Sequence, residues 1–374
     1  MYWLMWGILS FGVLIEAYGT EIIYKNQPLV KAKSVSVYFI FATVCMFLMA
    51  ALRYGQGQDY MAYASLYQID VYPYVDLVNK EPGYVFCAFM LNKMGVPFEV
   101  FVALLAAFEM YCFYRCIMKY GEYKVMGLLL LYPTLFLTYM FSGFRQAGAI
   151  AIFCGFVIPC LKEKKWLKFV IAVLAAASFH KTVLVMLILP IIYKIKYKNM
   201  CKLILAAAAA GVALCLIDVS APLTFILQDR AVVYVEAWGN SDISIMGIAE
   251  RTLLAGFVVW NTYKAGYEEE DCVTVFSKIY LVGYMLSVLT VRYQLMSSRL
   301  GVYCKALDIV LIPMLIYRMK PRSRKIMTAI VLAYAFVFLF KNIAMYIAQG
   351  GYNATVWTYP YITIFNKAAL WLRK

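Results

Sequence analysis

Arginines at the ends of apolar segments are the side chains whose types and positions most suggest chemistry. The charges of the other connections place these arginines on the external side, against the bias that keeps Lys and Arg inside. A guanidinium group is a planar fork of donors that suits phosphate oxygens. The cluster therefore predicts a diphosphate ligand, although any single arginine could instead reach lipid headgroups or pair with Asp59, Glu81 or Glu250. These arginines are Arg53, Arg145, Arg251, Arg292 and Arg299.

His180 is the only histidine of the sequence, and it interrupts an apolar stretch within Ser178-Phe-His-Lys181. It could accept the proton of an attacking hydroxyl or hold a substrate oxygen. It could equally be a core histidine bonded to a carbonyl group at a helix break. Asp59 and Glu81 are alternative bases. The sequence contains no Asp-x-Asp pair, metal-ligand cluster or glycine-rich phosphate loop, so we expect no metal and no cofactor.

A polar segment, Arg53-Tyr-Gly-Gln-Gly-Gln-Asp59-Tyr-Met-Ala-Tyr63, leaves the second apolar stretch, and Glu81-Pro-Gly-Tyr84 follows it. Its glycines allow the backbone to approach a partner closely. Tyr60, Tyr63 and Tyr84 could stack on sugar rings through their apolar faces, although aromatic residues at a membrane interface have the same appearance.

Four short motifs, in this order, resemble the EpsG/Wzy-like family of polysaccharide polymerases. One departure is Gln58, which stands where that family usually has threonine before the aspartate. The motifs cover about residues 50–305, and their order makes the resemblance specific. They are the Arg53–Tyr63 segment with Glu81–Tyr84, Phe144-Arg145-Gln146 at the start of an alanine-rich helix, Phe179-His180, and Ser298-Arg299 with Tyr303.

The resemblance implies a metal-independent membrane glycosyltransferase. Such an enzyme transfers a glycan from undecaprenyl diphosphate to the hydroxyl of the next lipid-linked repeat unit, at the external face of a bacterial plasma (inner) membrane. The product would be capsule, exopolysaccharide or O-antigen. The expected partners are polyprenyl-diphosphate-linked oligosaccharides, membrane lipid and other assembly proteins such as a flippase and a chain-length regulator.

The chemistry of the candidate residues themselves suggests a role for each of them in such a transfer. Arg145 with Arg292 and Arg299 would hold the leaving diphosphate and stabilise its developing charge. His180, Asp59 or Glu81 would orient or deprotonate the acceptor. The expected substrate-binding residues are Arg53, Arg145, Gln146, Arg292, Arg299, Tyr60, Tyr63, Tyr84 and Tyr303.

Composition determines the class of protein. The chain has 374 residues, of which 64% are hydrophobic and 15% charged, with a mean hydropathy of +0.75. A soluble globule typically has about a quarter charged residues, so this is a polytopic membrane protein. The net charge of +15 comes from short lysine clusters between apolar segments. Helix orientation explains these clusters, and we expect no binding to nucleic acid.

The apolar segments predict an all-α, polytopic integral membrane protein, GT-C-like, with about 11–13 transmembrane or re-entrant helices in one domain, 1–374. We expect external loops at about 53–97 and 219–248, a short re-entrant or interfacial piece at Tyr84–Met94 and a broken helix at about 167–193. Trp357–Trp371 would be a last span or an interfacial helix. The predicted spans are Tyr2–Ala17, Val35–Leu52, Phe98–Tyr114, Val125–Phe141, Phe144–Leu161, Cys201–Ile217, Arg251–Ala265, Phe276–Val291, Leu300–Tyr317 and Ile326–Ile347.

Two other functions use the same residues. A flippase or other transporter of lipid-linked oligosaccharides would need basic residues along a path to both faces and pseudo-symmetric halves, and the sequence shows neither. A ligase of the O-antigen type, which moves a finished glycan to another acceptor, shares the arginine and histidine chemistry and is not distinguished by residues.

Overall fold

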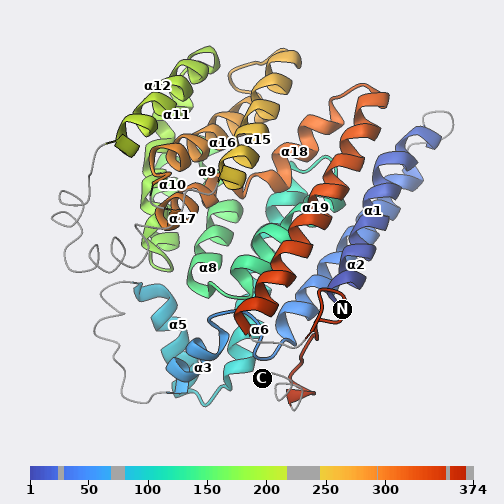
Figure 1. Ribbon diagram of the computed structural model, residues 1–374, viewed down its shortest axis with the longest axis vertical. Coiled ribbons are helices and arrows are strands. Elements are labelled where there is room, and N and C mark those ends of the chain that lie inside the picture. The colour runs from blue at the N-terminus through green and yellow to red at the C-terminus, as the bar shows by residue number, and fades with distance from the viewer. Residues whose placement is uncertain (24–28, 69–80, 217–244, 293, 351–353, 368–374) are drawn as a thin grey trace. The chain divides into compact units, whose positions relative to one another are not determined.

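The computed structural model describes residues 1–23, 29–68, 81–216, 245–292, 294–350 and 354–367. Within them the chain is almost entirely helical and has no β-strand, which confirms the predicted all-α, polytopic membrane protein (Figure 1). In the described part of the chain, five helices are long and apolar enough to cross a bilayer, and a sixth is added if α17 and α18 count as one span. The same residues contain four shorter apolar helices. The predicted total of 11–13 helices stays a prediction.

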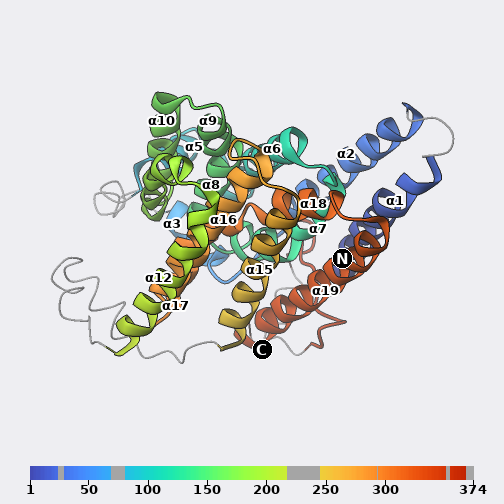
Figure 2. The same ribbon diagram turned by 90° about the horizontal axis from the view of Figure 1, so that it is seen from above.

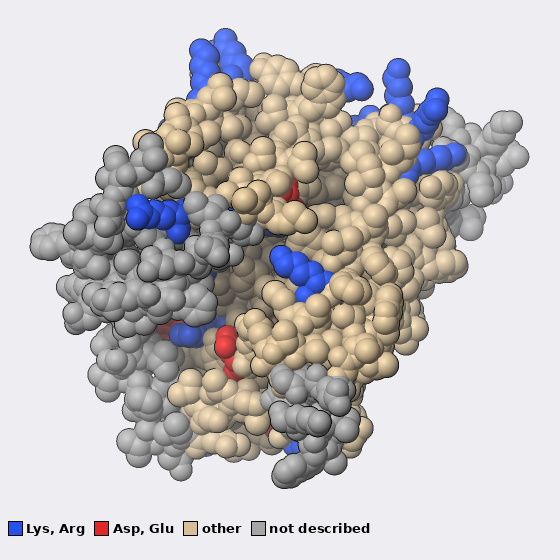
Figure 3. Space-filling view, in the orientation of Figure 1, with Lys and Arg blue, Asp and Glu red and all other residues tan. Residues whose placement is uncertain are grey.

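The chain forms two compact units. The first comprises Met1–Cys160, Leu167–Lys181 and Asp308–Lys374, and the second Leu161–Trp166 and Thr182–Leu307. Figure 3 shows that the described surface on one face is mostly free of Lys, Arg, Asp and Glu side chains. Apolar outer surfaces of this kind suit helices that contact lipid.

The first unit contains the long helices at both ends of the sequence. Helices α1 and α2 lie side by side in Figures 1 and 2, and α19 packs on α1. Its elements are α1 (Tyr2–Ile23), α2 (Leu29–Ala51), α3 (Tyr60–Gln68), α5 (Pro82–Lys93), α6 (Phe98–Tyr120), α7 (Lys124–Leu131), the π-helix η1 (Tyr132–Met140), α8 (Phe144–Ile152), the π-helix η2 (Phe153–Val157), α9 (Ile158–Lys162, which ends in the second unit), α10 (Trp166–Ala177), α18 (Asp308–Tyr317) and α19 (Pro321–Gly350).

The core of the first unit surrounds α7 and α8, whose apolar residues are buried on nearly all sides. The Glu16 carboxylate accepts hydrogen bonds from the backbone N–H groups of Lys124 at 2.6 Å, Val125 at 3.0 Å and Met126 at 3.1 Å. These amides begin α7 and have no acceptor within the helix. Glu16 therefore joins α1 to the start of α7.

The π-helix η1 leaves backbone carbonyls that α19 satisfies. Asn342 Nδ2 donates to the carbonyl of Pro133, and the Tyr346 hydroxyl donates to that of Leu137. Polar groups inside a membrane protein must find partners because lipid offers none. Asn342 and Tyr346 of α19 thus hold the segment that leads to α8.

The second unit packs around α16, which contacts α11, α12, α15 and α17. Gly283 of α16 and Gly301 of α17 allow a close approach, since a Cβ at Gly283 would lie 2.4 Å from Cys304 Cβ. The helices of this unit are the 3₁₀-helix η3 (Lys181–Ile188), which begins at its border, α11 (Leu189–Lys194), α12 (Tyr197–Leu216), α15 (Ile245–Lys264), α16 (Cys272–Leu289) and α17 (Gln294–Lys305).

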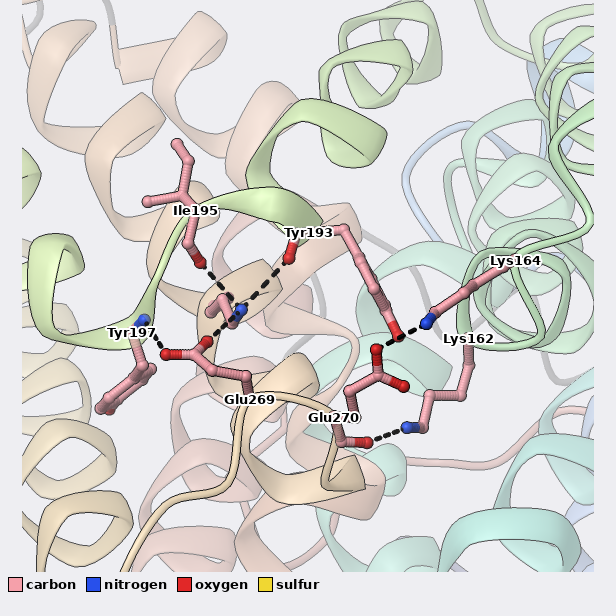
Figure 4. A network of polar contacts seen from close by, with 8 residues as sticks. Lys162, Lys164, Tyr193, Ile195, Tyr197, Glu269 and Glu270 are labelled. Atoms are coloured by element: carbon pink, nitrogen blue, oxygen red, sulfur yellow. Dashed lines mark hydrogen bonds and ion pairs between the residues drawn. The ribbon is translucent and has the colours of Figure 1, made fainter.

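A buried lysine ties the acidic loop of the second unit to its neighbours (Figure 4). Lys278 donates to Glu269 Oε2 at 2.7 Å and to the carbonyls of Tyr193 and Ile195. The Tyr197 amide donates to Glu269 Oε1 at 2.8 Å. Burial raises the pKa of Glu269, but the hydrogen bonds from Lys278 and Tyr197 outweigh burial and leave that pKa below its ordinary value.

The structure corrects one predicted span. Residues 357–366 are turns and extended backbone, not a helix. The predicted span Leu300–Tyr317 is bent by 48°, because α17 ends at Lys305 and α18 begins at Asp308. Most of the predicted external loop 219–248 lies outside the described residues, as does the middle of the loop 53–97.

Residues 357–366 are not helical because part of this segment bonds to residues that lie far away in the sequence. The Tyr54 amide donates to the Ile362 carbonyl at 2.9 Å, and the Ile364 amide donates to the Leu52 carbonyl at 3.0 Å. Arg53 and Thr363 form an antiparallel bridge between them. These bonds use the N–H and C=O groups that would otherwise form hydrogen bonds within a helix. The segment is therefore extended.

Candidate active site

Glu81 bridges Arg145 and His180, and the three residues form the centre of the candidate site. Glu81 Oε2 lies 2.5 Å from Arg145 Nη1, and Glu81 Oε1 lies 2.5 Å from His180 Nδ1. The Glu81 side chain is 8% exposed, that of His180 14% and that of Arg145 33%. The carboxylate is therefore covered, while the guanidinium group still reaches the surface. We call these residues the triad.

The start of α5 places Glu81 beside His180. Pro82 occupies the first turn, where its missing N–H costs no hydrogen bond. The amide of Gly83 donates to the Ser178 carbonyl at 2.9 Å, and that of Tyr84 donates to the same oxygen at 3.4 Å. A Cβ at Gly83 would lie 2.1 Å from Ser178 Oγ, so only glycine allows this approach. The link explains why Glu81-Pro-Gly-Tyr84 and Ser178-Phe-His180 occur in one sequence.

His180 lies where the chain stops being helical. Helix α10 ends at Ala177, and residues 178–180 are non-helical, which is where the sequence predicted a helix break. The amide of His180 donates to the Ala176 carbonyl at 3.0 Å. His180 Nδ1 points at Glu81, whereas Nε2 has no hydrogen-bond partner among the described residues. A carboxylate on Nδ1 favours the tautomer with the proton there, which leaves Nε2 as an acceptor.

Arg145 stands in the first turn of α8 and is aligned by Tyr63. Its Nε donates to the Tyr63 hydroxyl at 3.0 Å, while Nη1 reaches Glu81. Phe144 stacks on Tyr63 with ring centroids 4.8 Å apart, which keeps the tyrosine in place. The two contacts use two edges of the guanidinium group and leave Nη2 for a further acceptor.

The Tyr63 hydroxyl retains its proton at neutral pH. Burial raises the pKa of Tyr63 above its ordinary value, and the nearby Arg145 opposes this rise without cancelling it. Because the hydroxyl oxygen accepts from Arg145, its own O–H remains a donor that a substrate oxygen can use.

The Arg53 side chain is buried, and its contacts are with the protein itself. It is 2% exposed and donates to the carbonyls of Ala50 and Met140, both at 2.5 Å. Its Cζ lies 4.6 Å from the centroid of Phe141 and 5.1 Å from that of Phe144. These contacts account for the buried charge and hold the turn before α8. Its predicted contact with substrate stays a prediction.

The glycine-rich segment after Arg53 packs on the same turn. The amide of Gln58 donates to Ser142 Oγ at 3.0 Å, and Gln56 Nε2 donates to the Pro360 carbonyl at 2.6 Å. Gly57 has a φ of +101°, and a Cβ there would lie 1.9 Å from the Phe141 carbonyl oxygen. The segment therefore supports the start of α8 and, with it, Arg145.

The remaining candidate residues fall into two groups. Tyr60 and Tyr84 are buried in an aromatic cluster with Phe98, Phe101 and Phe144, beside the triad. Asp59 is exposed just before α3, and Gln146 is buried in α8. Three others lie in the second unit, so their approach to the triad stays a prediction; these are Arg292, Arg299 and Tyr303, whose hydroxyl is 2.8 Å from Thr182 Oγ1.

Sequence reasoning treated Glu81 and His180 as rival bases and missed that they are paired. It also missed Phe144 as the support of Tyr63 and the Ser178 carbonyl as the anchor of α5. The available signals were a single histidine at a helix break and a glycine after Glu81-Pro82. Among the described residues, no group of three or more His, Cys, Asp or Glu side chains is placed to hold a metal ion.

Comparison with known proteins agrees with the motifs. A family model described as the EpsG family matches residues 36–361, well over half of the chain. No curated protein and no solved structure matches the chain. The matched range includes Glu81, Arg145 and His180. The chain therefore belongs to the EpsG family, and its general role is that of a polysaccharide-polymerase-like membrane protein.

Proposed function

We propose that the chain is a metal-independent glycosyltransferase that polymerises lipid-linked repeat units. It transfers a growing glycan from polyprenyl diphosphate to a sugar hydroxyl of the next lipid-linked unit. The reaction takes place at the external face of a bacterial plasma membrane, where the sequence places Arg145. The observation that carries the proposal is the Glu81 carboxylate held between Arg145 and His180.

His180 is the general base of this proposal. Glu81 accepts the Nδ1–H, so Nε2 is left to accept the proton of the acceptor hydroxyl. The imidazolium that forms is stabilised by the same carboxylate, as in other triads in which an acidic residue orients a histidine. Glu81 then has a positioning role, and Asp59, exposed before α3, has none in this step.

Arg145 binds the leaving diphosphate. Its charge lies opposite the developing negative charge of the phosphate oxygens, and its planar donors match them. The Tyr63 hydroxyl, aligned by Arg145 Nε, offers one more donor to the same oxygens. Positive charge from a side chain serves here where other glycosyltransferases use a divalent cation.

The step balances in atoms and charge. The bond between the anomeric carbon and the phosphate oxygen breaks, and the bonding pair leaves with polyprenyl diphosphate. The acceptor oxygen forms the new glycosidic bond to that carbon. Its proton moves to His180 Nε2 and from there to solvent or to the diphosphate. The glycan is then longer by one repeat unit and remains on the acceptor's lipid.

The test is the size distribution of glycans in cells that express the protein. The gene is deleted and then restored as wild type, as Arg145→Ala or as His180→Gln, with protein levels matched. We expect single repeat units to accumulate on the outer face in the deletion and in both variants, and long chains only with wild type. Repeat units that accumulate facing the cytoplasm would support a flippase. Polymer of normal length in both variants would refute the assigned roles.

A further inference from the structure

A pocket of about 360 Å³ lies beside α3 in the first unit and is separate from the triad. Its volume is within the range of small-molecule sites in proteins, about 300–1,000 Å³. Neither Glu81, Arg145 nor His180 lines it. Its walls come from the segment before α3, from α3 itself, from the end of α5, from the start of α6 and from the connection between these two helices.

The pocket combines aromatic rings with uncharged hydrogen-bonding groups. Tyr54, Tyr60 and Tyr67 line it together with Phe98. Side chains with amide or hydroxyl groups, Ser65, Gln68 and Asn92, share the same walls. Rings that cover the apolar face of a sugar, with polar groups at its edge, suit pyranoses, which have one apolar face and a rim of hydroxyls.

The shape of this pocket is held from inside. The Tyr67 hydroxyl donates to the Val96 carbonyl at 2.8 Å, and Asn92 Nδ2 donates to the Tyr67 carbonyl at 2.7 Å. The ring of Tyr67 stacks on Phe101, with ring centroids 5.3 Å apart. These bonds join the end of α3 to the connection after α5, so the walls are formed before any ligand enters.

The charge of the pocket is neutralised. Glu99 is its one acidic side chain among the described residues, and Lys367 Nζ lies 2.6 Å from Glu99 Oε1. The same ammonium group lies 4.5 Å from the centroid of Tyr54. Among the described residues no basic side chain lines the pocket, and Lys367 offsets the charge of Glu99. The ligand best suited to this pocket is therefore uncharged.

Two faces of α3 serve the two sites. Tyr60, Ala64 and Tyr67 face the pocket, whereas Tyr63 faces Arg145. The helix has nine residues, and a helix with its side chains is about 10–12 Å across. A glycan held at the triad by its diphosphate end would therefore need to extend by only a few sugar residues to enter the pocket.

We propose that this pocket is a saccharide subsite, which binds neutral pyranose residues of the glycan at a distance from the bond that reacts. The inference rests on the proposed function for the source of its ligand. The subsite retains the growing chain between transfers, because a second contact raises the effective concentration of the glycan at the triad. Its loss shortens the polymer without removing the ability to join two units.

The direct test measures binding of free sugar. The probe is the neutral oligosaccharide fraction obtained by mild acid hydrolysis of the surface polysaccharide of the expressing cells, which carries no diphosphate or lipid. Binding is measured by calorimetry with the full chain in lipid nanodiscs. Ser65→Trp fills the pocket from an exposed position of α3, and Gln68→Ala removes an amide. Ala62→Trp is the matched control, because Ala62 is exposed on the same helix and does not line the pocket.

We expect wild type, Ala62→Trp and Arg145→Ala to bind the probe alike, and Ser65→Trp and Gln68→Ala to bind about tenfold more weakly. In cells, Ser65→Trp should give short polymer where Arg145→Ala gives single units. The subsite is refuted if wild type does not bind the probe or if Ser65→Trp binds as Ala62→Trp does. Binding restricted to an acidic fraction overturns the ligand class. If Arg145→Ala instead leaves polymer length unchanged, the proposed function fails whatever the binding result.

Discussion

His180 Nδ1 and Glu81 Oε1 are 2.5 Å apart although 99 positions separate the two residues in the sequence. The contact joins the residue just before α5 to the non-helical residues between α10 and η3. Gly83 makes this contact sterically possible. A histidine paired in this way has one nitrogen committed to the carboxylate and one available to a substrate. Glu81 and His180 therefore have different roles in the proposed step.

Glu81→Gln should abolish polymer formation although it preserves the shape of the side chain. The amide can present its N–H to His180 Nδ1, which favours the wrong tautomer, and it no longer balances the charge of Arg145. We expect the rate of repeat-unit joining to fall by about 10²–10⁴-fold, the contribution typical of a general base. The measurement is the rate at which purified protein joins lipid-linked repeat units.

Glu250→Gln is the matched control for that loss. Glu250 lies in the second unit, pairs with Lys305 at 2.5 Å and has no role in the proposed step. The control should retain at least half of the wild-type rate. An equal loss of joining rate in both variants would mean that Glu81 contributes no more to the rate than an ordinary ion pair does.

Arg145→Lys should lose activity although the positive charge is kept. A lysine has a single nitrogen and cannot contact Glu81 and the Tyr63 hydroxyl from two edges of one plane. We expect single repeat units to accumulate in cells, as in Arg145→Ala, with normal amounts of protein in the membrane. Arg115→Lys, at an arginine whose Cζ lies 4.6 Å from the centroid of Phe156, should leave the polymer unchanged. Normal polymer from Arg145→Lys would show that charge alone is sufficient there.

The long helices could be predicted from sequence because hydropathy reports burial in lipid directly. Phe98, predicted as the first residue of a span, begins α6, and Phe144 begins α8 as the motif indicated. The helix predicted from Trp357 was wrong for a physical reason. Its apolar residues suggest a helix, but its backbone bonds to Leu52 and Tyr54, and no local pattern reveals a partner some 300 residues away.

The candidate site was predictable residue by residue but not as an arrangement. Charge in an apolar setting singled out Arg53, Arg145 and His180, since such residues need a partner or a function. Which partner each one has depends on the folded chain. Arg53 turned out to hold backbone carbonyls, while Arg145 is held in place by Tyr63 and Glu81. The sequence could not separate these two situations because both arginines follow apolar helices.

Glu269→Gln should destabilise the second unit in a pH-dependent way. The pKa of Glu269 lies below its ordinary value, so the ionised carboxylate stabilises the fold above about pH 4.5. That stabilisation is lost as the pH falls through the lower value of the folded state. We expect a lower Tm for the variant at pH 7, measured on protein in detergent micelles, and a difference that shrinks as the pH falls below 4.5. A difference that is independent of pH would mean that the carboxylate charge is not what stabilises the loop.

Gly83→Ala should lower the joining rate by displacing Glu81 from His180, without removing a catalytic group. The added Cβ would lie 2.1 Å from Ser178 Oγ and 2.9 Å from Ser178 Cβ, so α5 or the segment before His180 must move. Either movement lengthens the contact between Glu81 and His180, and a displacement of about 1 Å at such a contact can lower a rate by about 10²-fold. The matched control is Gly7→Ala, since nothing lies within 4 Å of a Cβ at Gly7 in α1. We expect Gly83→Ala to show a large loss of joining rate with a Tm close to that of Gly7→Ala. A rate equal to that of the control would mean that the approach of Glu81 to His180 does not depend on this glycine and that the triad tolerates displacement.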